Sequence, residues 1–261
     1  MRNLDSINGA AKSTKFIFSI SLVIPIFMGF AAWALATGAA PSLALHDNYL
    51  ALLGLGISSL AILALPVPYI FRWNWETKYF GASVLSLSSA AIIGIYPTLC
   101  VAFYGSPPIF LRFLLVLFEF ILIFGWCRRF TDIYKNIYLK KTFFCCIYIE
   151  EPCGIYYSQQ GDKKVIESLL NFKQFPSSIY FIISSLIAFS LFPFATTISR
   201  LAGVPFIHIF LTIFATPLNL LFLGLATRGW LVFYFYPMKI KREKNKPIYV
   251  DISSRPPKIT I

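Results

Sequence analysis

The chain of 261 residues has little charge for its length. Asp, Glu, Lys and Arg make up 13% of its residues, whereas soluble domains usually carry about 25%. Hydrophobic residues make up 57% and aromatic residues 18%. This composition excludes an ordinary soluble globular domain.

The chain also lacks the short motifs that mark common enzyme sites. It contains no phosphate-binding loop, no dinucleotide-binding glycine pattern, no H-E-x-x-H and no G-x-S-x-G. Several acidic residues are scattered over a polar segment, and we interpret them as solvated surface: Asp132, Glu150, Glu151, Asp162 and Glu167. We therefore expect no enzyme and no catalytic residue.

Histidine is scarce, with two residues, and there are five cysteines. A zinc site needs four ligands at recognisable spacing, and no histidine lies near Cys145, Cys146 and Cys153. No cysteine falls in a predicted outer loop, so a disulfide framework is not expected. We predict reduced cysteines, no metal site and no cofactor.

Long uncharged runs dominate what the chain does contain. Each has about 19 to 26 residues, enough to cross a ~30 Å hydrocarbon core as a helix. The runs are 16–38, 48–71, 79–104, 109–127, 178–196 and 205–226. The first exceeds the length typical of a signal peptide, so we expect a permanent helix there. The sequence predicts an all-α polytopic membrane protein with six transmembrane helices.

Basic residues lie on one side of these runs. Of 23 Lys and Arg residues, all but Arg112 and Arg200 lie at the N-terminus or after the second, fourth or sixth run. Short loops rich in Lys and Arg stay cytoplasmic. Both termini are therefore predicted to be cytoplasmic, and we expect the protein in the inner (plasma) membrane of a bacterium.

The predicted organisation follows from this topology. It comprises a cytoplasmic tail (1–15), a four-helix transmembrane region (16–127), a cytoplasmic insertion (128–176), a two-helix transmembrane region with an interfacial extension (177–236) and a basic cytoplasmic tail (237–261). A helix over 205–236 would be ~48 Å long, well beyond the hydrocarbon core, so we predict a bend near Gly229.

The insertion between the fourth and fifth helices has its own pattern. Residues 129–141 suit an amphipathic helix on the membrane surface or a continuation of the fourth span. Residues 142–158 predict a small β-hairpin, and 247–252 can add a strand to it. A short helix is predicted over 163–172, with Asp162 capping its first turn.

Four polar side chains inside the predicted spans are candidate site residues: Glu119, Arg112, His208 and Asn219. A carboxylate in mid-membrane costs roughly 2.5–3.5 kcal/mol on insertion scales, so Glu119 should face the bundle interior or a cavity. One interpretation makes it a hydrogen-bonded acid that joins helices, with Arg112 reaching the outer interface. A second makes it a proton or cation site tuned by Arg112 and His208, and a third gives it a catalytic role.

The third run carries small residues at intervals of four, a pattern typical of close helix packing in membranes. These helix-packing candidates are Ala82, Ser86, Ala90 and Gly94. The pattern leaves open whether the neighbouring helix belongs to the same chain or to another subunit.

The formal net charge of +12 lies beside the spans, where Lys and Arg attract anionic lipid headgroups; we therefore expect no nucleic-acid partner. The favoured hypothesis is a non-enzymatic scaffold of an accessory or immunity type, with a protein partner or self-association. The alternatives are an oligomeric channel or transporter that uses Glu119, and a membrane enzyme subunit acting on lipid or an envelope polymer.

Overall fold

The structure is a computed structural model that describes residues 4–73, 75–139, 145–152, 154–170, 178–246 and 248–251. It is mostly helical. Its helices are α1 (Leu4–Ala39), α2 (Tyr49–Ala64), α3 (Val67–Ile70), α4 (Thr77–Leu87), η1 (Ser88–Ala91), α5 (Ile92–Tyr104), α6 (Ile109–Leu139), α8 (Gln159–Leu170), α9 (Ser178–Ser190), η3 (Phe192–Phe194), α10 (Ala195–Ala202), α11 (Phe206–Trp230), the π-helical η4 (Leu231–Phe235) and α12 (Tyr236–Lys244).

Among the described residues, four helical stretches are long and apolar enough to cross a membrane: Ser19–Ala39, Ile109–Asn136, Ile179–Ala202 and Phe206–Lys244. A fifth arises if α4 and α5, which meet at an angle of 42°, count as one span. The run 48–71 does not form one long helix, because Pro66 separates the 16-residue α2 from α3. Length and composition therefore support four or five of the six predicted spans.

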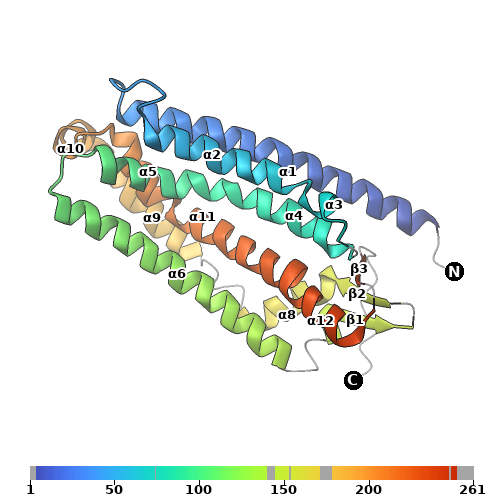
Figure 1. Cartoon of the computed structure of the whole chain (residues 1–261). Helices are drawn as coiled ribbons and strands as arrows, with labels where there is room; N and C mark the ends of the chain where they lie inside the picture. The colour runs from blue at the N-terminus through green and yellow to red at the C-terminus, as the bar shows by residue number, and fades with distance from the viewer. Residues whose placement is uncertain are drawn as a thin grey trace.

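The long helices lie along one axis (Figure 1). α1 packs on α2 and on α4, and α11 packs on α5, α6 and α9. The α4–α5 pair thus lies between α1 and α11 (Figure 1). At one end of the bundle are β1 (Tyr148–Glu151), β2 (Gly154–Ser158), β3 (Ile248–Asp251), α8 and α12. We call these elements, with η4 and the end of α6, the cap.

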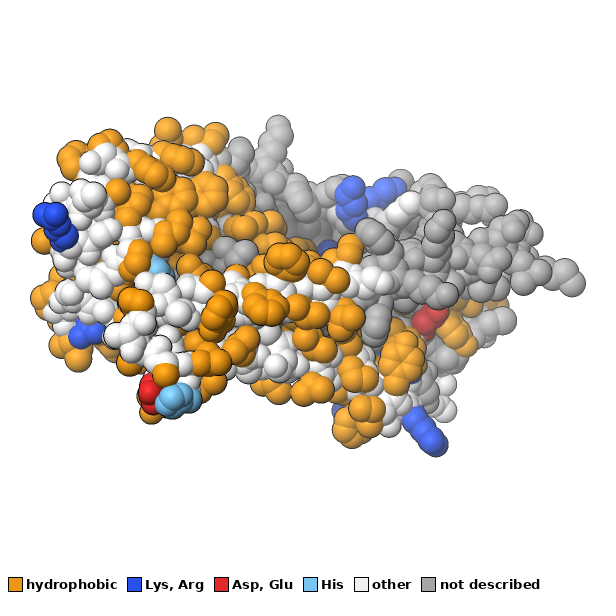
Figure 2. Space-filling view, turned by 90° about the horizontal axis from the view of Figure 1, so that it is seen from above, with side chains coloured by type: hydrophobic (Ala, Val, Ile, Leu, Met, Phe, Trp, Pro, Cys, Tyr) orange, Lys and Arg blue, Asp and Glu red, His pale blue; other side chains and the backbone are white. Residues whose placement is uncertain are grey.

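The surface between the two ends is apolar. Figure 2 shows hydrophobic side chains over the middle of the visible face, while Lys and Arg side chains gather toward its ends. Many large apolar side chains of α6 and α9 are exposed, including Phe113, Phe118, Ile182 and Leu186. Such exposed apolar surface is compatible with contact with lipid.

Small residues fill the contacts between the bundle helices. In α1 the buried positions recur every three or four residues: Ser21, Pro25, Gly29, Ala32, Ala36 and Ala39. A Cβ added to Gly54 of α2 would lie 2.4 Å from the Cβ of Ala32, so α1 and α2 are in close contact. Ala32, Ala36, Ala39 and Ala51 belong to one buried cluster with Tyr96 and Cys100, which we call the small-residue core.

The four packing candidates of the third run, Ala82, Ser86, Ala90 and Gly94, are all buried. Ser86 donates a hydrogen bond to the carbonyl of Ser21 in α1, and a Cβ added to Gly94 would lie 2.3 Å from the Cβ of Asn219 in α11. The helices that pack against Ser86 and Gly94 therefore belong to the same chain. Because the 3₁₀ turn η1 interrupts the helix at Ser88–Ala91, Ser86 and Gly94 contact different helices.

The predicted hairpin is confirmed. β1 pairs antiparallel with β2, with Tyr148 opposite Tyr157 and Glu151 opposite Gly154. The predicted extra strand is also present: β3 pairs with β2 in parallel, with Ile155 opposite Ile248. The sheet order is β1-β2-β3. One face, bearing Tyr148, Tyr157 and Ile248, is buried against the end of the bundle.

The structure shows how α6 and α11 continue into the cap. α6 runs without interruption from Ile109 to Leu139, so the segment after the fourth run continues the helix as far as Leu139. The helix is not broken at the predicted bend near Gly229: it continues through the π-helical η4 into α12. Residues 231–234 and Tyr236 lie in the aromatic core of the cap, whereas Phe235 is exposed. This buried cluster also includes Trp75, Phe130, Tyr134, Tyr148 and Tyr157.

Candidate functional site

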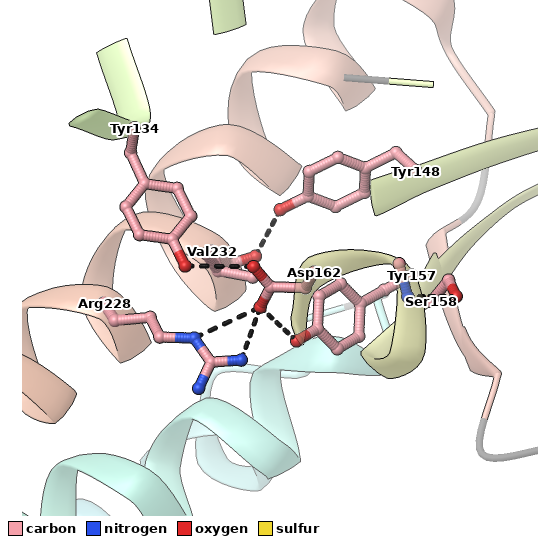
Figure 3. A network of polar contacts seen from close by, with 8 residues as sticks. Tyr134, Tyr148, Tyr157, Ser158, Asp162, Arg228 and Val232 are labelled. Carbon is pink, nitrogen blue, oxygen red and sulfur yellow. Dashed lines mark hydrogen bonds and ion pairs between the residues drawn. The ribbon is translucent and has the colours of Figure 1, made fainter. Parts of the chain in front are cut away.

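Asp162 lies at the centre of the cap and is fully buried, with 0% of its surface exposed. Its Oδ2 atom accepts hydrogen bonds from Nε (3.2 Å) and Nη2 (2.6 Å) of Arg228, and from the hydroxyl of Tyr157 (2.7 Å). Its Oδ1 atom accepts one from the hydroxyl of Tyr134 (2.9 Å). Figure 3 shows these donors converging on the carboxylate. The network joins α6, α8, α11 and β2.

The start of α8 explains why Asp162 points inward. The helix begins at Gln159, and the hydroxyl of Ser158 accepts a hydrogen bond of 3.0 Å from the Gly161 amide. Ser158 therefore caps the helix. Asp162 lies inside the first turn instead, so its predicted capping role and its interpretation as solvated surface are both wrong.

Gly161 lets this turn approach the rest of the cap. A Cβ added there would lie 1.8 Å from the carbonyl oxygen of Cys146. No side chain fits at that distance, so glycine is required for the close approach. The sequence Ser158-x-x-Gly161-Asp162 thus begins the helix, allows close packing and places the carboxylate toward α11.

The tyrosines of the sheet support the same arrangement. Tyr148 donates its hydroxyl hydrogen bond to the carbonyl of Val232 in η4 (Figure 3). Burial raises the pKa of Tyr148 well above its ordinary value, and the negative charges around it add to this effect. Burial, followed by the charge of Asp162, has the same effect on the pKa of Tyr157. Both hydroxyls therefore remain protonated donors at neutral pH.

The π-helical segment η4 supplies acceptors to the side chains around it. The carbonyl of Phe233 accepts hydrogen bonds from Nε1 of Trp75 (3.2 Å) and from the hydroxyl of Thr77 (3.4 Å). π turns are uncommon and recur at functional positions in helices. Here the turn connects α11 to the segment that enters α4 and to strand β1.

A cavity of about 180 Å³ borders the Asp162 network. Its apolar walls come from α4, α11 and η4, and its polar ones from Ser88, Tyr157, Gln159 and Arg228. Arg228 thus lies between Asp162 on one side and the cavity on the other, with 24% of its side chain exposed. The complete lining is Phe80, Val84, Leu87, Ser88, Tyr157, Gln159, Phe222, Leu225, Arg228, Gly229 and Phe233.

Glu119 and Asn219, two of the four candidates from the sequence, lie together. The amide Nδ2 of Asn219 donates a 3.1 Å hydrogen bond to Glu119 Oε1, joining α11 to α6. Glu119 is 8% exposed and Asn219 2%. The Oδ1 atom of Asn219 is buried and has no hydrogen-bond partner. The pair joins helices, and it leaves one polar atom free beside the carboxylate.

The other two candidates lie elsewhere and do not contact Glu119 through any described hydrogen bond. Nη1 of Arg112 donates to the carbonyl of Ala102 at 3.1 Å. The ring nitrogens of His208 lie 3.1 Å from the carbonyl oxygen of Pro205 and 2.9 Å from that of Leu35 in α1. Both residues thus contact backbone carbonyls near the end of the bundle opposite the cap.

Asn48 is a further connection that the sequence analysis did not single out. Its Oδ1 atom accepts hydrogen bonds from the Ala51 amide (3.0 Å) and the Tyr104 hydroxyl (2.7 Å), and its Nδ2 donates to the Ala36 carbonyl (3.1 Å). It therefore caps α2 and joins that helix to α1 and α5. Its place just before an apolar run was an available cap signal.

Within the part of the chain that the structure describes, no group of three or more His, Cys, Asp or Glu side chains could hold a metal ion. Asp162 is enclosed by its donors and has no exposed surface. The network is suited to holding elements together rather than to proton transfer or nucleophilic attack.

Comparisons with family models, with curated proteins and with solved structures find no match for this chain. The fold and the site therefore define only a class. The chain is a mostly helical protein with several apolar helices, compatible with an integral membrane protein, and with a small sheet joined to one end of its bundle.

Proposed function

We propose that this protein is a non-enzymatic membrane scaffold that binds a protein partner through its cap. In this proposal it spans the bacterial inner (plasma) membrane six times, with both termini and the cap in the cytoplasm. The single observation that carries the proposal is the Asp162 network, which joins a three-stranded sheet to two long helices through one fully buried carboxylate.

The six-span topology is supported by the course of the chain. α1, α2, the α4–α5 pair, α6, α9 and α11 all run along the bundle axis (Figure 1). α2 continues toward the cap as α3, so the broken run 48–71 still covers the length of the others (Figure 1). The start of α1 and strand β3 lie at the same end (Figure 1).

The orientation is supported by the charges at the cap. Lys241, Arg242 and Lys244 occupy the last turn of α12, and Arg128 and Arg129 lie in α6 as it approaches the cap. Clusters of basic residues beside spans are retained in the cytoplasm.

The scaffold role follows from how the cap is built. Buried charged groups contribute little net stability, and their best-attested use is to fix one arrangement of the parts that they join. Here the fixed parts are a three-stranded sheet and two apolar helices. A surface held in one geometry loses little conformational entropy when a partner binds.

Purification in mild detergent tests the proposal. The full chain should retain a stoichiometric partner, and a charge-reversed cap, Glu151→Lys with Lys239→Glu, should lose it; both side chains are exposed. Asp47→Lys is the matched control, since this exposed residue precedes α2 at the opposite end of the bundle. Equal loss in both variants, or no stoichiometric partner with the unaltered chain, would reject the cap as the binding surface.

A channel or transporter is the second candidate, and the unpaired Oδ1 of Asn219 beside Glu119 favours it. Buried carboxylates within a membrane often mark ion pathways. Flux assays on reconstituted liposomes test this candidate. Proton or cation flux that disappears in Glu119→Gln would replace the scaffold proposal with this one, whereas flux no greater than that of empty vesicles would exclude transport of the ions tested.

A further inference from the structure

We infer that the cavity beside Arg228 binds the anionic headgroup region of a membrane phospholipid. This inference rests on the proposed membrane orientation but not on the scaffold role. Its chemical basis is one guanidinium nitrogen that has no hydrogen-bond partner among the described residues, together with apolar walls from α4, α11 and η4.

The guanidinium has hydrogen-bonding capacity left. Nε and Nη2 are used by Asp162, and no hydrogen bond is described for Nη1. Figure 3 shows Nη1 pointing away from Asp162, toward the ribbon of α4. Since Arg228 also lines the cavity, it can hold Asp162 on one side and a second anion on the other. Planar guanidinium groups with several donors suit phosphate oxygens well.

The walls favour an amphiphile over a free anion. Phe80, Val84 and Leu87 line one side, and Phe222, Leu225 and Phe233 line another. Arg228 is already paired with the charge of Asp162, so this site offers a soluble phosphate little net attraction. A lipid brings apolar carbons that these walls can remove from water, because burial of apolar area stabilises binding.

The size of the cavity limits what enters it. At about 180 Å³ it is slightly larger than an engineered apolar cavity of ~150 Å³ that holds benzene. It is smaller than the ~300–1,000 Å³ of pockets for drug-sized ligands. The cavity therefore accepts a headgroup phosphate with a few adjoining carbons, while the acyl chains remain in the bilayer.

The position of the cavity agrees with this occupant. Arg228 follows the apolar part of α11, and Tyr157 and Gln159 belong to the cap. The cavity thus lies where the apolar helices meet the cap. In the proposed orientation this is the level of the inner-leaflet headgroups, where membrane proteins bind anionic lipids.

Val84→Phe is designed to fill the cavity while keeping the Asp162–Arg228 pair. Val23→Phe is its matched control, because Val23 is 51% exposed on α1 and lines no part of the cavity. Arg228→Lys provides a second test. It retains the positive charge but removes the forked donors, so it should weaken binding by roughly tenfold, the worth of about one charge-assisted hydrogen bond.

The experiment uses the full chain, purified in a neutral detergent and titrated with phosphatidylglycerol, phosphatidylcholine or inorganic phosphate. Native mass spectrometry measures bound lipid, and the midpoint of thermal unfolding measures protection. Phosphatidylglycerol should bind preferentially and raise the midpoint for the unaltered chain and Val23→Phe, but not for Val84→Phe. Circular dichroism confirms that each variant is folded before titration.

Three results would overturn the inference. Equal binding of phosphatidylcholine would show that the anionic head is not recognised. Undiminished preference for phosphatidylglycerol in a folded Val84→Phe would place the lipid elsewhere. Equal protection by inorganic phosphate would assign the cavity to a soluble anion. None of these results depends on a protein partner, so failure here is distinguishable from failure of the scaffold proposal.

Discussion

The small-residue core of the bundle and the aromatic core of the cap are built by opposite means. The first uses Ala32, Ala36, Ala39 and Ala51, and glycines such as Gly54 let helices touch. The second uses large rings, with Tyr157 packed edge-on against Phe233 at 5.1 Å and Trp73 stacked on Trp75 at 5.2 Å.

The difference reflects the two solvents that the proposed orientation assigns to these regions. Between helices already surrounded by lipid, burial of apolar area gives no advantage, so close contact of small residues supplies the attraction. Where water surrounds a sheet, removing large apolar rings from it is strongly favourable. The cap also contains a fully buried carboxylate, that of Asp162.

The largest expected effect comes from breaking the network of the cap. Asp162→Ala should lower the free energy of unfolding by about 3–5 kcal/mol, because it leaves the Arg228 guanidinium without its buried partner. Denaturant unfolding in detergent measures this change, and limited proteolysis should show cleavage within the cap. Glu151→Gln, on the exposed end of β1, is the control. A change below about 1 kcal/mol in Asp162→Ala would mean that the network does not hold the cap.

Alkaline pH should loosen the cap before the bundle. The pKa of both Tyr148 and Tyr157 is raised in the fold, so the folded state retains protons that the unfolded chain loses above a pH of about 10. The stabilisation is complete below that pH and is lost as the pH rises further. At one pH unit above 10, each of the two tyrosines should have lowered the free energy of unfolding by about 1.4 kcal/mol.

Tyrosinate absorbance measured against pH provides the check. Ionisation of these two tyrosines should coincide with loss of the cap structure in the unaltered chain, and Tyr148→Phe with Tyr157→Phe should remove that late step. Ionisation of every tyrosine near pH 10 with the fold intact would contradict their burial.

A smaller effect is expected in the small-residue core. Gly54→Ala should cost about 1–3 kcal/mol, the usual range for overpacking a well-packed interior, because the new Cβ would lie 2.4 Å from that of Ala32. Gly56→Ala is the matched control two residues away, where an added Cβ meets nothing within 4 Å. Thermal unfolding in detergent compares the two variants, and equal stability would contradict the close contact of α1 and α2.

The Glu119–Asn219 pair should contribute less. Glu119→Gln retains an oxygen that can accept the hydrogen bond from Asn219 Nδ2, so the free energy of unfolding should change by less than about 1 kcal/mol, in line with hydrogen bonds between membrane helices. The same thermal assay measures it. A loss above about 2 kcal/mol would show that the charge itself holds α6 to α11.

The smallest effect is expected at Glu150, on the surface of the cap. Hydrogen bonds from Lys244 and Lys246 lower the pKa of Glu150 to about 2, so any stabilisation is present above the ordinary pKa and is lost as the pH falls toward 2. Because the side chain is exposed and salt screens such pairs, Glu150→Gln should leave the unfolding midpoint unchanged at physiological ionic strength. A clear fall in the midpoint would show that this surface cluster stabilises the cap.

Local patterns in the sequence predicted several elements well. The run of β-branched and aromatic residues around the turn at Glu150–Gly154 predicted the hairpin, and the small residues Ala82, Ser86, Ala90 and Gly94 predicted a buried face. Both signals depend on neighbours a few residues apart. The same reasoning applied to Gly29, Ala32 and Ala36 would have found the packing face of α1.

Asp162 was misinterpreted because its partners are distant in sequence. Tyr134 is 28 residues away and Arg228 is 66, and an aspartate beside glycine and lysine is more often a solvated cap. Glu119 was recognised as needing an interior position, but nothing in the sequence identified Asn219, 100 residues away, as its partner.

By itself, the sequence determined the apolar helices, the asymmetry of charge and the hairpin, since these follow from hydrophobicity and from periodicity over a few residues. Only the tertiary structure decided which buried groups meet: Asp162 with Arg228, Glu119 with Asn219, and Ser86 with α1. The physical reason is that a buried polar atom must find a partner within hydrogen-bonding distance, and the packing of the helices decides which atoms come that close.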